Sequence, residues 1–267
     1  MNRIARLMGL AALVLVTSSG LTYAQPTDAE VPAAREVAEG DLPSGWDVLD
    51  REIEAIGGEE RYLKIKNFVA TGIFSMPAMG INGPIVRTEL APDKLHMLIQ
   101  FGGMGEMQQA TDGTVAWAIP PGGDTPQKLE GEDGQQMIER AQFYNRVHPR
   151  KLYESAKVTG TESVNGEPCY RVSLVTKEGT NSLSYYNIES GLMVKSMARS
   201  TPEAETFDTV VEFSDFRDID GIVHAFVMKQ SVQGNEFTIT FESIEHDAEI
   251  DQSIFSMPKP QIPEGEI

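Results

Sequence analysis

Histidine and cysteine residues are few and widely spaced in this chain. The four histidines are His96, His148, His224 and His246, and the single cysteine is Cys169. No two histidines share the i, i+2 or i, i+4 spacing that would place both on one face of a strand or a helix, so the sequence favours surface histidines over a metal site. One cysteine excludes an internal disulfide and a cysteine-cluster zinc site, and no base lies near it in the sequence to activate it as a nucleophile.

Carboxylates are abundant, and a pair of them could serve a glycoside hydrolase. The chain has 40 Asp and Glu residues in 267, so close pairs such as Asp218 and Asp220 arise from composition alone. There is neither a Gly-x-Ser-x-Gly elbow nor a Walker phosphate-binding loop. We therefore expect no enzymatic activity, no catalytic residue, no metal and no cofactor; a carboxylate-dependent exported hydrolase is the less favoured alternative.

Methionine is concentrated between residues 76 and 107, where five of the ten methionines after residue 24 lie near Phe74, Ile99 and Phe101 in the sequence. Methionine is unbranched and polarizable, so it adapts to ligands of variable shape as readily as it fills gaps in a core. Two interpretations follow: a soft apolar cleft for acyl chains, or a solid core. The candidate lipid-binding residues are Phe68, Phe74, Met76, Met97, Ile99, Phe101, Trp117, Met137, Phe143 and Tyr144.

The N-terminal residues are typical of a secretory signal peptide. Arg3 and Arg6 precede an apolar run at 7–16, and Thr22-Tyr23-Ala24 offers small residues for signal peptidase. We predict a signal peptide over 1–24 and a periplasmic or otherwise exported protein. Because no cysteine lies near the cleavage site, we expect no lipid anchor.

The formal net charge of −18 is unevenly distributed. Residues 25–60 hold 11 acids and 2 bases, and residues 242–267 hold 7 acids and 1 base. An acidic chain is poorly suited to nucleic acid, whose affinity depends on Lys and Arg. The middle of the chain is nearly balanced, so its charge is compatible with an apolar ligand derived from a membrane.

The chain divides into segments of different composition. Residues 25–42 are rich in Pro, Ala and acids and predict a disordered linker, 43–258 a folded domain, and 259–267 an extended tail. Apolar residues at helical spacing predict a helix that Ser44 can cap and Gly57-Gly58 can stop.

A second helix is predicted over 132–146, and the rest of the domain alternates with a period of two. Turn signals such as Asn165-Gly166 and Asp220-Gly221 separate the strands, which favours an antiparallel meander. The fold class is therefore mainly β with few helices. We expect a curled antiparallel sheet, an incomplete β-barrel of about eleven strands, with two helices as a lid.

Several short motifs follow one another in a recognisable order. They are Ala55-Ile56-Gly57-Gly58, Ile65-Lys66-Asn67-Phe68, Pro92-Asp93-Lys94, Thr111-Asp112-Gly113, Tyr185-Tyr186-Asn187, Phe213-Ser214-Asp215-Phe216 and Phe255-Ser256-Met257-Pro258. This arrangement resembles the LolA/LolB-like family of periplasmic lipoprotein carriers over roughly residues 45–258. The chain differs from a typical carrier in its greater length and its acidic linker and tail.

The resemblance implies an incomplete barrel whose lid covers an apolar cavity for lipid or lipoprotein acyl chains, and a role in outer membrane lipoprotein sorting. It also implies an arginine on an early strand that bonds the lid, and Arg87 is the candidate. Membrane-associated proteins are candidate partners of such a carrier, and we expect a monomer. The alternative, which belongs to another functional class, is an exported scaffold or interaction module with a solid core.

Overall fold

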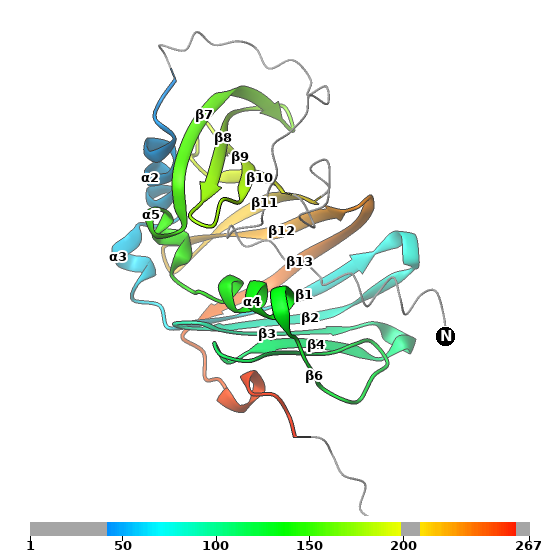
Figure 1. Ribbon diagram of the computed structural model, residues 1–267. Coiled ribbons are helices and arrows are strands. Elements are labelled where there is room, and N and C mark those ends of the chain that lie inside the picture. Colours follow the sequence, from blue (N-terminus) through cyan, green and yellow to red (C-terminus); the bar gives the residue numbers. More distant parts are fainter. Residues whose placement is uncertain (1–41, 199–208, 260–267) are drawn as a thin grey trace, which may run out of the picture.

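A computed structural model of the chain describes residues 42–198 and 209–259 (Figure 1). The predicted signal peptide, the predicted linker except Leu42, and the predicted tail except Lys259 lie outside these residues. Within the two described ranges, no helix is long and apolar enough to cross a membrane.

The described residues form one antiparallel sheet of 13 strands. The strands are β1 (Asn67–Met76), β2 (Ile81–Leu90), β3 (Lys94–Gln100), β4 (Glu106–Thr111), β5 (Ala116–Ile119), β6 (Gln127–Lys128), β7 (Tyr153–Val164), β8 (Glu167–Thr176), β9 (Asn181–Asn187), β10 (Met193–Ala198), β11 (Thr209–Ile219), β12 (Ile222–Val232) and β13 (Asn235–His246). The mainly β class and the meander are as predicted. One difference is β6, which has two residues and is too short to show a period of two.

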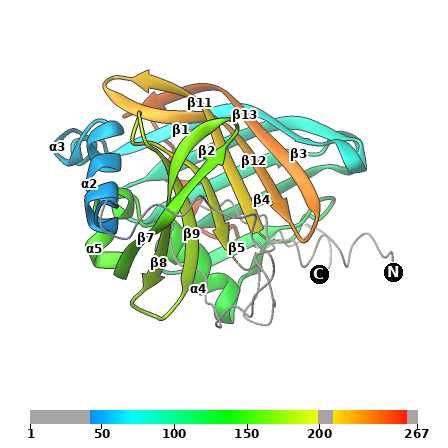
Figure 2. The same ribbon diagram turned by 90° about the horizontal axis from the view of Figure 1, so that it is seen from above.

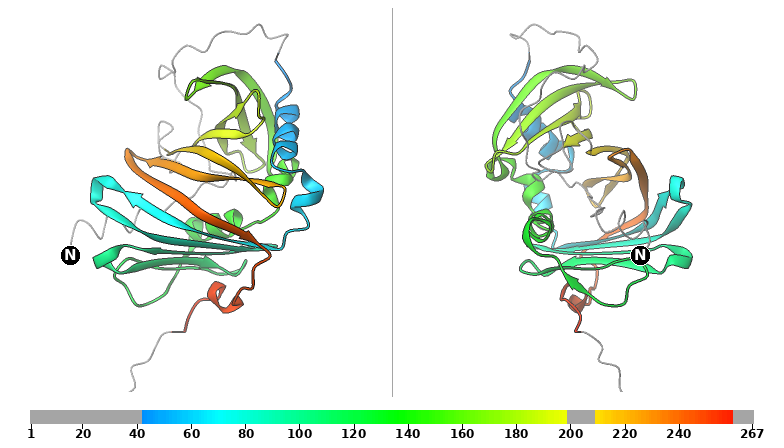
Figure 3. Two further views of the ribbon diagram at one scale, coloured as in Figure 1. Left: turned by 180° about the vertical axis from the view of Figure 1, so that it is seen from behind. Right: turned by 45° about the vertical axis from the view of Figure 1, so that its right-hand side comes forward.

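The sheet consists of two meanders joined by their first and last strands. β1 to β6 run consecutively in one direction, β13 to β7 run in the other, and β1 pairs with β13. β6 and β7 are the two edges, so the sheet is curled but not closed. Figures 2 and 3 show it curving from β7–β9 at one end to β3–β5 at the other.

Four helices occur among the described residues, where two were expected. They are α2 (Gly45–Ala55), α3 (Glu59–Tyr62), α4 (Gly131–Arg140) and α5 (Pro149–Leu152), with 3-10 turns η1 (Pro77–Met79), η2 (Gly102–Met104), η3 (Asn145–Val147) and η4 (Gln252–Phe255). The predicted cap is confirmed, since Trp46 N donates to Ser44 Oγ at 3.2 Å. The helix predicted over 132–146 ends at Arg140, because Phe143 N donates to Pro92 O at 2.9 Å instead of continuing the helix.

Residues 131–152, comprising α4, η3 and α5, connect the two edges of the sheet, and we call them the covering segment. In Figure 3 this segment runs along the open side between the two ends of the curl. α4 lies against β4 and β5, and α5 lies against β7. The covering segment therefore occupies the position of the predicted lid, with α2 beside it on β7 and β8.

α2 is held closely against the sheet at both of its ends. A Cβ at Gly45 would lie 2.4 Å from the carbonyl carbon and oxygen of Ala156, so the helix start touches the β7 backbone. At the other end, Val223 N donates to Ile56 O at 3.0 Å. This places α2 across the β7 side of the curl as a fixed support for the cavity described next.

Candidate functional site

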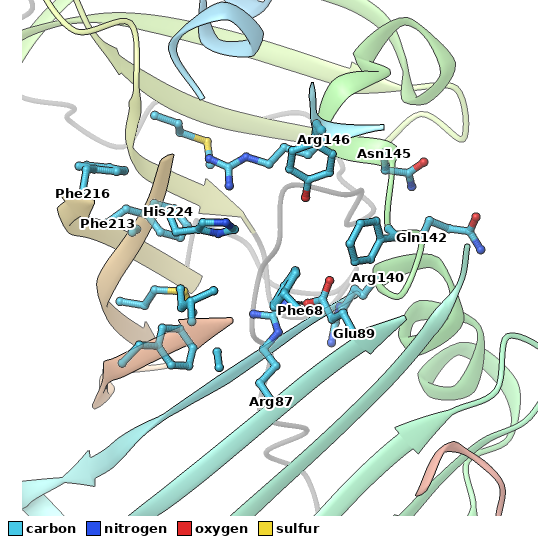
Figure 4. A pocket seen from close by; sticks show the side chains of 18 residues that line it. Phe68, Arg87, Glu89, Arg140, Gln142, Asn145, Arg146, Phe213, Phe216 and His224 are labelled. Atoms are coloured by element: carbon cyan, nitrogen blue, oxygen red, sulfur yellow. Dashed lines mark ion pairs between the residues drawn. The ribbon is translucent and has the colours of Figure 1, made fainter. Parts of the chain in front are cut away.

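A cavity of about 120 Å³, partly open to solvent, lies on the concave face of the sheet, beside the covering segment (Figure 4). β1, β2, β11, β12 and β13 contribute to its walls, and the covering segment contributes from the other side. The lining residues are Tyr62, Phe68, Ala70, Arg87, Glu89, Arg140, Gln142, Phe143, Asn145, Arg146, Met193, Phe213, Phe216, His224, Ala225, Met228, Phe241 and Ile244.

The structure brings some of the predicted cleft residues to this cavity and places others elsewhere. Phe68, Phe143 and Arg87 line it. Six others belong to the same hydrophobic core as Phe68 and Phe143 without lining the cavity: Phe74, Met97, Ile99 and Phe101 are buried, and Met76 and Tyr144 are partly buried.

Two predicted cleft residues lie outside both groups. Met137 is buried on α4. Trp117 pairs with Ala110, which pairs with His96, so these three side chains share the opposite face of the sheet from Met97. There Trp117 Nε1 donates to Phe255 O at 2.9 Å under the C-terminal turn η4.

The sequence analysis missed the cavity residues that come from β10 to β13. Met193, Phe213, Met228 and Phe241 form much of the apolar wall. They lie near the cavity residues of β1 and β2 because β1 pairs with β13. This pairing joins residues about 170 positions apart in the sequence, such as Phe74 and Ile239. Their alternation was visible in the sequence, but nothing local indicated which strands would face Phe68.

The polar part of the cavity contains buried ion pairs. Arg87 and Glu89, two residues apart on β2, are ion-paired, and they are only 5% and 6% exposed. Arg87 Nε is buried without a hydrogen-bond partner among the described residues. The predicted contact between Arg87 and the lid stays a prediction.

A second ion pair joins the covering segment to α2. Arg146 Nη2 lies 3.8 Å from Glu52 Oε1, too far for a hydrogen bond. Burial raises the pKa of Glu52, and Arg146 opposes that shift only in part. The guanidinium of Arg146 is thus incompletely paired where it meets the cavity.

Two histidines meet beside the cavity, which the sequence analysis did not predict. His224 Nε2 lies 2.8 Å from His246 Nε2, and His224 is buried beside Phe68. The expectation of surface histidines is wrong here, and also for buried His96. A spacing rule examines single elements, whereas His224 and His246 meet from neighbouring strands β12 and β13.

The cavity residues show no arrangement of the kind used in metal or nucleophilic chemistry. No group of three or more His, Cys, Asp or Glu residues that could hold a metal occurs within the described ranges. Cys169 is buried away from the cavity, and burial raises the pKa of its thiol, which keeps it protonated. What the cavity offers instead is apolar surface with a cationic side.

Comparisons with known proteins identify the fold. No family model matches the chain, and neither does any curated protein. One similar crystal structure is that of a DUF1329 family protein from Desulfovibrio piger, with a TM-score of 0.54 and 12% identity, covering 79% of this chain and 95% of that one. A LolA superfamily protein from Nitrosomonas europaea has a TM-score of 0.52 and 14% identity, covering 80% of this chain and 98% of that one. A proposed outer membrane lipoprotein-sorting protein domain from Vibrio parahaemolyticus has a TM-score of 0.52 and 10% identity, covering 78% of this chain and 94% of that one. The chain therefore has a LolA-like fold, which confirms the resemblance at the level of architecture.

Proposed function

We propose that this protein is an exported, non-catalytic carrier that holds a lipid or lipoprotein acyl chain between the concave sheet face and the covering segment. The observation that supports this most is the cavity itself, in which phenylalanine and methionine side chains surround a space at the open side of the sheet. The lipoprotein-sorting description of the Vibrio domain with the same fold supports the choice of ligand. Membrane-associated proteins would deliver and receive the cargo.

The cavity is smaller than most ligand-binding pockets. Small-molecule pockets usually measure roughly 300–1,000 Å³, and this one measures about 120 Å³. A carrier must therefore enlarge it by moving the covering segment. Hydrogen bonds from Phe143 N to Pro92 O at 2.9 Å and from Tyr144 OH to Ile65 O at 3.1 Å join that segment to residues beside β1 and β3. Pairs of Arg146 with Glu52, His148 with Glu59 and Arg150 with Asp50 also hold it.

The energetics favour partial burial of the ligand. Each buried methylene contributes about 0.8 kcal/mol, so full burial of a sixteen-carbon chain would contribute on the order of 12 kcal/mol. Binding that strong would make release slow, because affinity differences appear mostly in the dissociation rate. A cavity with arginine and glutamate among its aromatic residues binds more weakly and suits a protein that must release its cargo.

The alternative is an exported interaction module with a solid core. The small cavity and the tight packing of Phe74, with ring centroids 5.6 Å from Phe101 and 5.4 Å from Phe237, favour it. The two functions differ in one observable property. A carrier takes up an acyl chain, whereas a solid core does not.

Native mass spectrometry of the protein purified from a secreting bacterium, with titration of a fluorescent fatty acid, tests the proposal. We expect co-purified lipid, and at least tenfold weaker fatty-acid binding for Met228→Trp, which fills the cavity. Met104→Trp is the matched control, because Met104 is 41% exposed and outside the cavity. Circular dichroism verifies that both variants fold. Absence of both co-purified lipid and fatty-acid binding in the unmodified protein would rule out the carrier.

A further inference from the structure

The cavity has a cationic side that its own carboxylates do not neutralise. Arg87, Arg140 and Arg146 all line it, and Glu89 is the only carboxylate that does. Figure 4 shows Arg87 and Arg146 entering the space from opposite sides, with His224 between them. A buried charge is costly unless it is paired and hydrogen-bonded, so an excess of guanidinium groups calls for an additional anion.

The guanidinium of Arg87 is buried but not fully bonded. Arg87 is 5% exposed, and its Nε has no hydrogen-bond partner within the described part of the chain. An arginine presents five N–H donors in a planar fork that matches the two oxygens of a carboxylate or phosphate. Nη2 of that fork is ion-paired with Glu89, and Arg87 lines the cavity.

Arg146 supplies a second donor group from the covering segment. Its carboxylate neighbour Glu52 lies 3.8 Å away and is not hydrogen-bonded to it. The combined positive field is also felt by His224, because Arg146 and Arg87 both add to the effect of burial in lowering the pKa of that imidazole. Arg87 and Arg146 therefore act on the same volume of the cavity.

We propose that the ligand is an anionic amphiphile whose carboxylate or phosphate group binds between Arg87 and Arg146 while its acyl chain lies along Phe68, Phe213 and Met228. This inference rests on the proposed function and specifies the chemical class of the ligand. Neutral lipids of equal chain length bind less tightly, since they offer no anion to the two guanidinium groups, each of which has only an incomplete pairing with a carboxylate. The anion also links β2 to the covering segment.

Isothermal titration calorimetry at neutral pH with laurate, lauryl phosphate and lauryl alcohol tests this inference. We expect both anionic amphiphiles to bind at least tenfold more tightly than the alcohol, a difference of about 1.4 kcal/mol. Arg146→Gln should reduce the preference to less than threefold without weakening binding of the alcohol, and Arg146→Lys should keep most of it. Arg171→Gln is the matched control, because Arg171 lies on β8, pairs with Glu162, and belongs neither to the cavity lining nor to the covering segment.

The outcomes separate the two proposals. Equal binding of laurate and lauryl alcohol would overturn the anionic ligand and leave the carrier intact. Failure of all three amphiphiles to bind would overturn the carrier as well. Inorganic phosphate is expected to bind weakly if the acyl chain matters, so tight binding is informative. If inorganic phosphate binds as tightly as lauryl phosphate, or acetate as tightly as laurate, the ligand is a free anion. That result would contradict the acyl-chain part of both proposals. The comparison among ligands uses the unmodified protein, so it stands even if a variant fails to fold.

Discussion

The phenol of Tyr144 donates a hydrogen bond to the backbone carbonyl of Ile65 at 3.1 Å. This bond joins the covering segment to the residues immediately before β1, next to the contact between the rings of Phe143 and Phe68. It is a side-chain bond to a backbone group that water can also satisfy, so it can open and close without disrupting the sheet.

Tyr144→Phe should therefore ease opening of the covering segment. Loss of one neutral hydrogen bond weakens closure by about 0.5–1.5 kcal/mol, because the ring and its packing remain. We expect association of a fluorescent fatty acid to become roughly twofold to tenfold faster, measured by stopped-flow mixing, because this bond must break before the chain enters. An unchanged association rate would show that this bond does not control the covering segment.

Gly45→Ala should destabilise the domain. A Cβ at this position would lie 2.4 Å from the backbone of Ala156, so α2 must shift away from β7. We expect a loss of about 1–3 kcal/mol in the free energy of unfolding in urea, in the range of overpacked cores. Gly103→Ala is the control, since a Cβ there meets nothing within 4 Å, and equal stability of the two variants would contradict the close packing.

Stability should decrease as the pH falls because of His224. Burial, together with Arg146, His246 and Arg87, lowers the pKa of His224 to about 3, whereas an exposed histidine has a pKa of about 6.5. The unfolded chain binds more protons below pH 6.5, so the stabilisation is present above that pH and is lost as the pH falls toward 3.

Between pH 7.5 and 5 this group should cost about 2 kcal/mol of the free energy of unfolding. In His224→Gln the free energy of unfolding should decrease by about 2 kcal/mol less between pH 7.5 and 5 than in the unmodified protein. Each protein is compared with its own value at pH 7.5. Urea denaturation at the two pH values measures this. Parallel losses in the variant and the unmodified protein would assign the pH dependence to other groups.

The C-terminal turn η4 should contribute to the stability of the outer sheet face. Phe255 is fully buried, and its carbonyl accepts the bond from Trp117 Nε1. Phe255→Ala should lower the free energy of unfolding by about 3–5 kcal/mol, as for other large-to-small core changes. Trp117 fluorescence should shift to longer wavelength as water reaches the indole, and an unshifted spectrum would mean that η4 does not shield it.

Local patterns in the sequence predicted the elements better than the site. Ser44 capped its helix as expected, and turns such as Asp220-Gly221 separated strands where the alternation stopped. Each of these depends on residues a few positions apart. The strand β6 was missed because two residues cannot show a period.

The cavity depends on pairings that no local pattern encodes. The apolar wall of Phe213 and Met228 lies near Phe68 because β1 pairs with β13, and His224 meets His246 because β12 lies beside β13. Alternation showed that Trp117 was buried, but not that it faced η4 rather than Met97. The resemblance pointed to Arg87, but nothing in the sequence indicated its buried partner Glu89.

The most direct measurement of the central claim is methyl NMR of the methionine residues with a spin-labelled fatty acid. Met193 and Met228 line the cavity, whereas Met79 and Met104 are exposed elsewhere. A carrier that takes the acyl chain into the cavity predicts strong, saturable broadening of the Met193 and Met228 signals, reversed by unlabelled laurate. Broadening confined to Met79 and Met104, or none at saturating ligand, would contradict the account.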